Sequence, residues 1–250
     1  MSLSMLLPLA STIMSAVFAV ILLRRYAQRK GKHLLIWGIA MIMYGLGTFA
    51  EFYLSLAWSA TIFRLWYLCG ATLVAAWLGQ GTIHLLVRKP HVADVLLIVL
   101  TIASVIAAVH LFATPLNESL FDPSVPVSHQ YATNSAKGVV GLMPEGGVRS
   151  YSFLFNIYGT VALVGGALYS AYIFWRKRIM PQRVLGNVFI ALGGLAPALG
   201  GTLARVGATE FLYLSELIGV VVIFIGFRLA TTQQPVPANA APAATTTSSA

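Results

Sequence analysis

Long runs of apolar residues alternate with short polar segments along most of this chain. A transmembrane helix needs about 20 mostly apolar residues, and seven runs reach that length. The gaps between them are short, except at 114–150. The pattern therefore predicts an all-α, polytopic membrane protein with seven transmembrane helices in one domain, 1–230. The expected spans are 5–23, 34–56, 62–87, 93–113, 151–175, 184–204 and 210–229.

The basic residues lie mainly in alternate gaps between these spans. Twelve of the sixteen Lys and Arg residues follow the first, third, fifth and seventh spans, with clusters at 24–32 and 176–183. Because short cytoplasmic loops are enriched in Lys and Arg, this split predicts the N-terminus outside and the C-terminus inside. No basic residue precedes the first span, so we expect it to remain as an anchor and not to be a cleaved signal peptide.

Two longer polar segments remain, the loop 114–150 and the tail 231–250. The loop is expected outside and is rich in Pro, Gly, Ser and Asn, which favour turns. Loops of this length are lids, binding loops or disordered segments, and these alternatives stay open here. The tail is low in complexity and carries no charge, so we expect it to be disordered in the cytoplasm.

Composition narrows the class of protein. Only 9% of the residues are charged and 58% are hydrophobic, whereas soluble domains carry about 25% charged residues. The net charge of +9 belongs to the clusters that set topology, so the expected partner is the lipid bilayer and not nucleic acid. Cys69 is the only cysteine, which excludes an intrachain disulfide and a multi-cysteine metal site.

The sequence contains no arrangement of residues that is typical of catalysis or of a cofactor. HExxH, GxSxG and P-loop motifs are all missing. A retinal protein resembling the microbial rhodopsins needs a lysine in the last span, and none lies between Glu210 and Arg228. His84 and His110 are expected at opposite ends of their helices, which does not suit haem ligation. We therefore expect a non-enzymatic protein without a cofactor.

Glu216 is the charged residue that most needs an explanation. It is the only one between Glu210 and Arg228, and a carboxylate inside an apolar span is costly unless it has a partner or a function. Other charges fall at the outer helix ends, and several polar residues share helical faces with them at i, i+3 and i+4 spacing. These faces are expected to converge in an outward-open polar pocket. The candidate ligand-binding residues are Glu216, Tyr213, Arg64, Tyr67, Glu51, Arg205 and Asn156.

Two interpretations of this group stay open. In the first, Glu216 forms the floor of the pocket, and Arg64 or Arg205 compensates its charge. In the second, the charges are structural, and Arg64 with Glu51 and Arg205 with Glu210 form interfacial ion pairs that hold helix ends together.

Similarity between the two halves suggests an internal repeat. Aligning Tyr67 with Tyr213 pairs Gly70 with Glu216, and the basic ends of the first and fifth spans also match. This alignment predicts a 3+1+3 parallel repeat, an arrangement found in some transporters. The sixth span is rich in glycine and contains Pro197, which favours close helix packing or, as the alternative, a kinked and moving gate.

The second and third spans carry a resemblance to a known family. The run LLIWGIAMIMYGLGTFAEFYLSL followed by FRLWYLCGATLVAAWLGQGTIHLL resembles the N-terminal seven-transmembrane sensor region of bacterial histidine kinases. Glu51, Arg64 and Tyr67 fit the pattern of that region, although no kinase domain follows in this sequence. The segments AEFYLSLAWS and VLGNVFIALGGLAPALGGTLARVG are also similar to stand-alone bacterial seven-helix membrane proteins, a likeness that implies no activity.

These observations together predict a function class. We expect a receptor-like or sensory module in the plasma membrane, specifically a bacterial inner membrane, that binds a small molecule and signals to a separate cytoplasmic partner. The alternatives are a small-solute transporter built from two three-helix halves and a structural or accessory subunit. The inner parts of the third and seventh spans are almost entirely apolar, VAAWLG and VVVIFIG, which argues against a transport path.

Overall fold

The computed structural model describes residues 3–87, 89, 91–178, 180–205 and 210–231, and this part of the chain is helical without regular strands. Interruptions divide two of the long helices into consecutive segments. The segments are α1 (Leu3–Arg29), α2 (Lys32–Leu54), α3 (Ala60–Leu65), η1 (Trp66–Leu73), α4 (Val74–Leu86), α5 (Val92–Ala113), η2 (Glu118–Leu120), α6 (Val127–Gln130), η3 (Ser135–Lys137), α7 (Arg149–Thr160), η4 (Val161–Gly165), α8 (Gly166–Arg176), α9 (Pro181–Arg205) and α10 (Glu210–Thr231).

Seven helices of the described chain are long and apolar enough to cross a membrane, which confirms the predicted fold class. Most of their ends lie within a few residues of the expected bounds. The largest difference is at α1, which continues through Arg24 and Arg25 and ends at Arg29. The next residue, Lys30, has a φ of 53°. A left-handed residue directly after a helix is a common way to terminate it.

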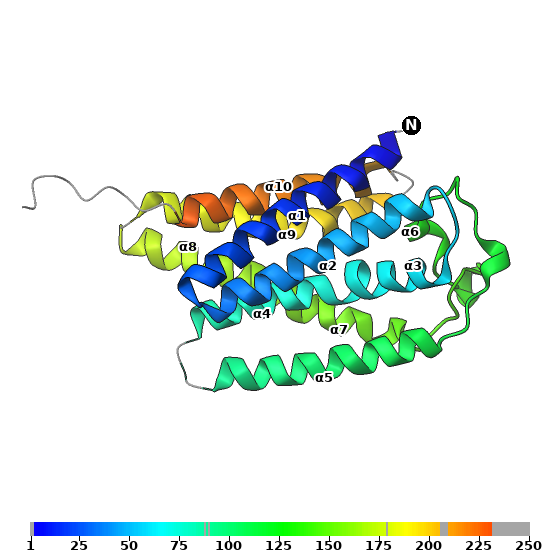
Figure 1. Cartoon of the computed structure of the whole chain (residues 1–250), viewed down its shortest axis with the longest axis horizontal. Coiled ribbons are helices and arrows are strands. Elements are labelled where there is room, and N and C mark those ends of the chain that lie inside the picture. The colour runs from blue at the N-terminus through cyan, green and yellow to red at the C-terminus, as the bar shows by residue number, and fades with distance from the viewer. Residues whose placement is uncertain (1–2, 88, 90, 179, 206–209, 232–250) are drawn as a thin grey trace, which may run out of the picture.

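The long helices run side by side and define two ends of a bundle (Figure 1). The segment 114–148, which we call the cap, lies at the same end as the start of α1, and we call this the cap end. The other end contains the turn between α8 and α9 and the last turn of α10, and we call it the basic end. Which end faces the cytoplasm, and whether the halves form a repeat, stay predictions.

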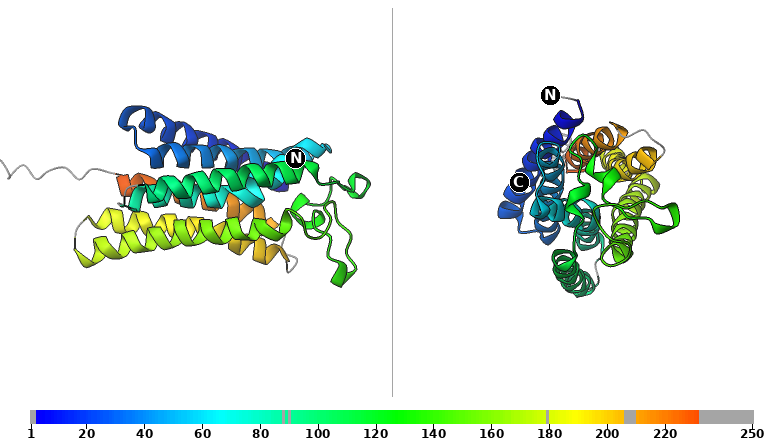
Figure 2. Two further views of the ribbon diagram at one scale, coloured as in Figure 1. Left: turned by 90° about the horizontal axis from the view of Figure 1, so that it is seen from below. Right: turned by 90° about the vertical axis from the view of Figure 1, so that its right-hand side faces the viewer.

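The centre of the bundle is filled by apolar side chains from helices that are distant in sequence. Leu22, Met41 and Val220 are fully buried, and they pack in one cluster with Leu78. Helix α5 lies at the rim, as a view along the bundle shows (Figure 2). Its outward side chains are mostly exposed and apolar, as expected for a helix that faces lipid.

Helices α9 and α10 pack with their backbones in close approach at paired glycines. A Cβ atom on Gly193 would lie 2.7 Å from the carbonyl oxygen of Gly219, and one on Gly186 would lie 2.6 Å from that of Gly226. Any larger residue at these positions would force the helices apart. The predicted close packing of the glycine-rich span is therefore confirmed, and a gating role for Pro197 stays a prediction.

Two of the transmembrane helices contain π-helical stretches, η1 and η4. The Asn156 side chain in α7 donates a hydrogen bond of 2.9 Å to the carbonyl oxygen of Ala71 within η1. Nearby, the α7 backbone touches α4, because a Cβ on Gly159 would lie 2.2 Å from the carbonyl carbon of Ala75. Side chains that insert into a helical ladder are a recognised cause of such local rewinding, and π-helical turns often occur at functional sites.

The cap is folded, which favours a lid or a binding loop over disorder among the alternatives for this segment. Val127, Leu142, Met143 and Val148 are buried in a cluster with aromatic residues of α3 and η1. Two isolated bridges, Ala132 to Met143 and Asn134 to Val139, hold the cap chain against itself. Whether the cap opens as a lid stays a prediction, and the expected tail beyond Thr231 lies outside the described residues.

Candidate functional site

Glu51 is placed inside the bundle by the polar face of α2. Its side chain belongs to the face formed by Tyr44, Gly47, Thr48 and Glu51, and the residue is only 5% exposed. Trp66 of η1 donates its indole N–H to Glu51 Oε1 at 2.9 Å. The carboxyl group therefore lies between two helices close to the cap, away from lipid.

Glu216 of α10 faces Glu51 across the bundle. The two carboxyl groups lie within hydrogen-bonding range of each other. The Oε2 atoms of both are buried, without a hydrogen-bond partner from the rest of the described chain. Tyr44 donates its hydroxyl group to the backbone carbonyl of Glu216 at 2.7 Å, and buried Tyr213 interacts electrostatically with both carboxyl groups. We call Glu51 and Glu216 the acid pair.

The described chain supplies no cationic partner for the acid pair. Two ion pairs, Lys32–Asp94 and His84–Asp94, have nitrogen–oxygen distances of 2.7 and 3.3 Å, and both lie at the basic end. Arg64, which we expected to compensate Glu216 or to pair with Glu51, instead donates to the carbonyl oxygen of Thr114 at 3.1 Å. That expectation is wrong, because the α3 helix directs the Arg64 guanidinium toward α5, where it also lies 5.9 Å from the ring centre of Phe112.

Two of the predicted charges cannot be placed in the site. The side chains of Arg205, at the end of α9, and Glu210, at the start of α10, lie outside the described residues. Their proposed ion pair, and compensation of Glu216 by Arg205, stay predictions.

Tyr67 and Asn156 form a second polar group, on the α7 side of η1. The Tyr67 hydroxyl lies 3.1 Å from Ser152 Oγ, which itself donates to the carbonyl oxygen of Arg149. Asn156 donates to the Ala71 carbonyl oxygen. The Tyr67 ring also packs edge-on against Trp66, with 6.1 Å between ring centres. The structure thus brings six of the seven candidates to the cap end, although Arg64 faces Thr114 and not the acid pair. Trp66 lies between Tyr67 and the acid pair.

Trp66 was not among the predicted site residues, although it connects the two groups. A signal was present in the sequence, since Trp66 lies on a helix with a polar face and an indole N–H needs an acceptor when buried. Tyr67 was a candidate because it lies three residues from Arg64, whereas Trp66 entered only through the aromatic pattern of the family.

A polar network at the basic end was also missed. Gln80 is completely buried, accepts a hydrogen bond from the Tyr158 hydroxyl and donates to the Ala93 carbonyl oxygen at 2.9 Å. Its side chain also contacts His84 Nδ1 at 3.1 Å, and His84 Nε2 lies 3.3 Å from Asp94 Oδ1. The i, i+4 spacing of Gln80 and His84 was the available signal for this network.

The two carboxylates of the cap that accept backbone N–H groups differ from the acid pair. Asp122 accepts from the backbone N–H and hydroxyl of Ser124 at 2.8 and 2.6 Å, and these bonds hold its pKa below the usual value. Glu145 accepts from the backbone N–H of Ser135 at 3.1 Å, and hydrogen bonds from the Ser135 side chain and backbone together lower the pKa of Glu145. Both are therefore stabilised as charged groups in contact with solvent.

Two open surface pockets of the described chain lie away from Glu216. One of about 640 Å³ lies between the ends of α8 and α9, and one of about 430 Å³ lies between α5 and α7. No cluster of three or more metal-ligating side chains occurs among the described residues. The outward-open pocket is therefore not seen at the acid pair in this part of the chain, and it stays a prediction.

The arrangement at the acid pair limits what can bind there. Two ionised carboxylates are hydrogen-bond acceptors only, so they cannot hydrogen-bond to each other without a proton between them. Two buried negative charges without a counter-charge are strongly unfavourable. A bound proton or a small cation would relieve both problems.

No protein-family model, curated protein or solved structure matches this chain. The resemblance to the sensor region of histidine kinases therefore rests on the sequence segments alone, and it stays a prediction. What is established is a multi-pass, all-helical membrane protein.

Proposed function

We propose that this chain is a non-enzymatic, receptor-like sensory module of a bacterial plasma membrane, with the acid pair as its binding site. The observation that carries the proposal is the contact between Glu51 and Glu216, two carboxyl groups from distant helices that lack a cationic partner among the described residues. The ligand class that this chemistry favours is a proton or a small cation.

The surroundings of the acid pair support a signalling role. Tyr44 connects α2 to the α10 backbone at the level of Glu216, so a change in the separation of the carboxyl groups moves both helices. From Glu216, α10 continues for about 18 Å to Arg228 at 1.5 Å per residue. The glycine contacts between α9 and α10 make these helices a packed unit that reaches the basic end, where a separate cytoplasmic partner would bind.

The transport alternative has weaker support. A transporter needs a polar route between the two ends of the bundle. Between the acid pair and the Gln80 network lie the buried apolar side chains of Met41, Leu78 and Val220. A structural subunit without a ligand is the remaining alternative, and it predicts no response to any cation.

The test measures thermal unfolding of the purified protein in detergent. The wild type is titrated with protons, monovalent cations and small amines, and compared with Glu51→Gln, Glu216→Gln and the double Gln variant. We expect at least one cation, or acidification itself, to raise the unfolding temperature of the wild type. The double variant should lose this response, because an amide keeps the shape but not the charge of the carboxyl group.

Asp94→Asn serves as the matched control, since it removes a carboxylate at the other end of the bundle. It should keep the wild-type response. If the double variant responds like the wild type, the acid pair is not the site. If the wild type responds to no cation and the double variant unfolds at a lower temperature, the structural interpretation replaces the sensory one.

A further inference from the structure

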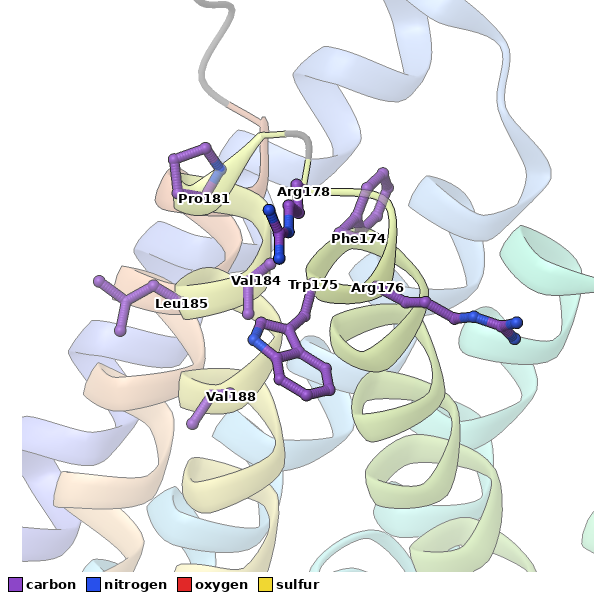
Figure 3. Close-up of a pocket in the computed structure, with 8 residues that line it drawn as sticks. All are labelled: Phe174, Trp175, Arg176, Arg178, Pro181, Val184, Leu185 and Val188. Carbon is purple, nitrogen blue, oxygen red and sulfur yellow. The ribbon is translucent and has the colours of Figure 1, made fainter.

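The cavity between α8 and α9 combines an apolar wall with a cationic rim. Figure 3 shows the Arg178 side chain extending into the space between the two helix ends, above Trp175 and Val184, while Arg176 points away from it. The volume is about 640 Å³. The lining residues are Phe174, Trp175, Arg176, Arg178, Pro181, Val184, Leu185 and Val188.

The charge of this site is not compensated within the part of the chain that the structure describes. Neither Arg176 nor Arg178 forms an ion pair or a side-chain hydrogen bond within the described chain. The lining contains no acidic residue. Arg183 lies close by, with its guanidinium 5.6 Å from the ring centre of Phe174. An anion is therefore the complementary ligand.

The apolar wall decides which anion fits. Trp175 is 68% exposed and Leu185 is also exposed, and both belong to membrane-spanning helices, so this wall is open to lipid. Val184 and Val188 continue the wall toward the bundle centre by one helical turn. A free phosphate would make no favourable contact with this apolar wall. A phospholipid would place its phosphate beside Arg178 at the interface and its acyl chains against the apolar wall further inward.

We propose that the α8–α9 cavity binds an anionic phospholipid of the adjoining leaflet. Arg178 holds the headgroup phosphate, and Trp175, Val184 and Val188 contact the upper part of an acyl chain. Basic pockets between transmembrane helices are suited to such headgroups, and one Lys or Arg near the membrane surface contributes about 1 kcal/mol. This proposal is independent of the acid pair, which lies at the other end of the bundle.

The test uses quenching of tryptophan fluorescence by lipid with brominated acyl chains. Full-length protein in mixed micelles is titrated with brominated phosphatidylglycerol or brominated phosphatidylcholine, and a Trp175→Phe variant supplies the background signal. We expect phosphatidylglycerol to quench Trp175 at a lower mole fraction than phosphatidylcholine. Arg178→Gln should raise the phosphatidylglycerol midpoint about fivefold, the factor that corresponds to one lost basic contact.

Arg176→Gln is the matched control, because it removes the same charge two residues away but points outside the cavity. It should leave the midpoint close to the wild-type value. Val188→Phe, which fills the apolar part without changing charge or adding a tryptophan, should weaken the binding of both lipids. Inorganic phosphate should not displace the brominated lipid. Equal midpoints for the two lipids, equal effects of the two arginine variants, or displacement by phosphate would each overturn the proposal.

Discussion

The two ends of the bundle hold acidic residues in opposite ways. At the basic end, Asp94 has a side chain that is 42% exposed, and it lies 2.7 Å from Lys32 Nζ and 3.3 Å from His84 Nε2. At the cap end, Glu51 is buried, and its described partners are the neutral Trp66 indole and the second carboxyl group, Glu216. The Asp94 carboxylate is therefore exposed to solvent and has two basic neighbours.

The difference indicates which carboxyl groups lower the stability of the fold. An exposed ion pair contributes little, because solvent already screens both charges. A buried carboxyl pair without a counter-charge is unfavourable unless something neutralises it. Such a contact persists only if the rest of the fold stabilises it, and this is typical of groups with a function. The following predictions test whether the two ends differ as described, from the largest expected effect to the smallest.

Removal of Glu51 should destabilise the protein far more than removal of Asp94. Glu51→Ala leaves the buried Trp66 N–H without an acceptor and creates a gap, which together should lower the free energy of unfolding by about 2 kcal/mol. Asp94→Ala should stay close to the wild type. The measurement is unfolding by SDS titration, followed by circular dichroism. Glu51→Gln, which still accepts from Trp66, should recover most of the loss, and equal effects at Glu51 and Asp94 would contradict the comparison.

The second prediction concerns how the backbone brings Glu51 to Trp66. A Cβ on Gly47 would lie 2.8 Å from Gly70 Cα, whereas a Cβ on Gly70 would lie 3.4 Å from Gly47 Cα, an ordinary contact. Gly47→Ala should therefore separate α2 from η1 and cost about 1 to 2 kcal/mol. Gly70→Ala should be tolerated, with a helical propensity gain.

The same SDS titration checks the two glycine variants, and emission of the tryptophan residues reports any displacement of Trp66. If Gly70→Ala were as harmful as Gly47→Ala, the close approach would not have the geometry that the structure gives it.

The third prediction measures the neutral polar contacts of the cap end. Asn156→Ala removes the bond to the Ala71 carbonyl oxygen across the helices and a bond to Ser152 within α7. Asn187→Ala is the control, since Asn187 donates only within α9, to the Arg183 carbonyl oxygen at 2.7 Å. The difference between the two variants should be about 0.6 kcal/mol, the average for interhelical hydrogen bonds in membranes. No difference would mean that Asn156 does not support the π-helical stretch.

The membrane spans could be predicted from the sequence because length and hydrophobicity alone determine them. The convergence of Glu51, Tyr67, Asn156, Tyr213 and Glu216 at one end also followed from helical spacing. The partner of Arg64 did not. Its position near Glu51 in sequence suggested an ion pair, but the direction of a side chain depends on which neighbouring helix offers an acceptor, here the Thr114 carbonyl oxygen.

Two further features could not be predicted from the pattern of hydrophobic and polar residues. The contact of Glu51 with Glu216 joins residues from the second and the last transmembrane helices, and hydrophobic periodicity carries no information about which helices become neighbours. The folded cap was hidden by its composition, because Pro, Gly, Ser and Asn favour both turns and disorder. Its order comes from four buried apolar residues that pack on α3 and η1.

The smallest expected effect is the response of the cap to acid. The folded-state pKa values of Asp122 and Glu145 lie below the ordinary values of 3.8 and 4.5. The two carboxylates therefore stabilise the folded cap at pH values above those ordinary values. This stabilisation is lost as the pH falls through the lowered pKa values. Partial burial also lowers the pKa of His129 below 6.5, so its cost to the folded cap begins as the pH falls through that value. Acid should loosen the cap.

Hydrogen exchange of residues 118–148 between pH 7 and about pH 2, corrected for intrinsic rates, measures this loosening. Asp122→Asn and Glu145→Gln should weaken the increase of the exchange rate at acid pH. His129→Gln should weaken the increase that begins near neutral pH. The acid pair should respond with the opposite sign, because a proton neutralises it and acid then tightens the contact of α2 with α10. If the cap and the α2–α10 contact loosened together, the two kinds of carboxylate would not be distinct, and the comparison between satisfied and unsatisfied acids would fail.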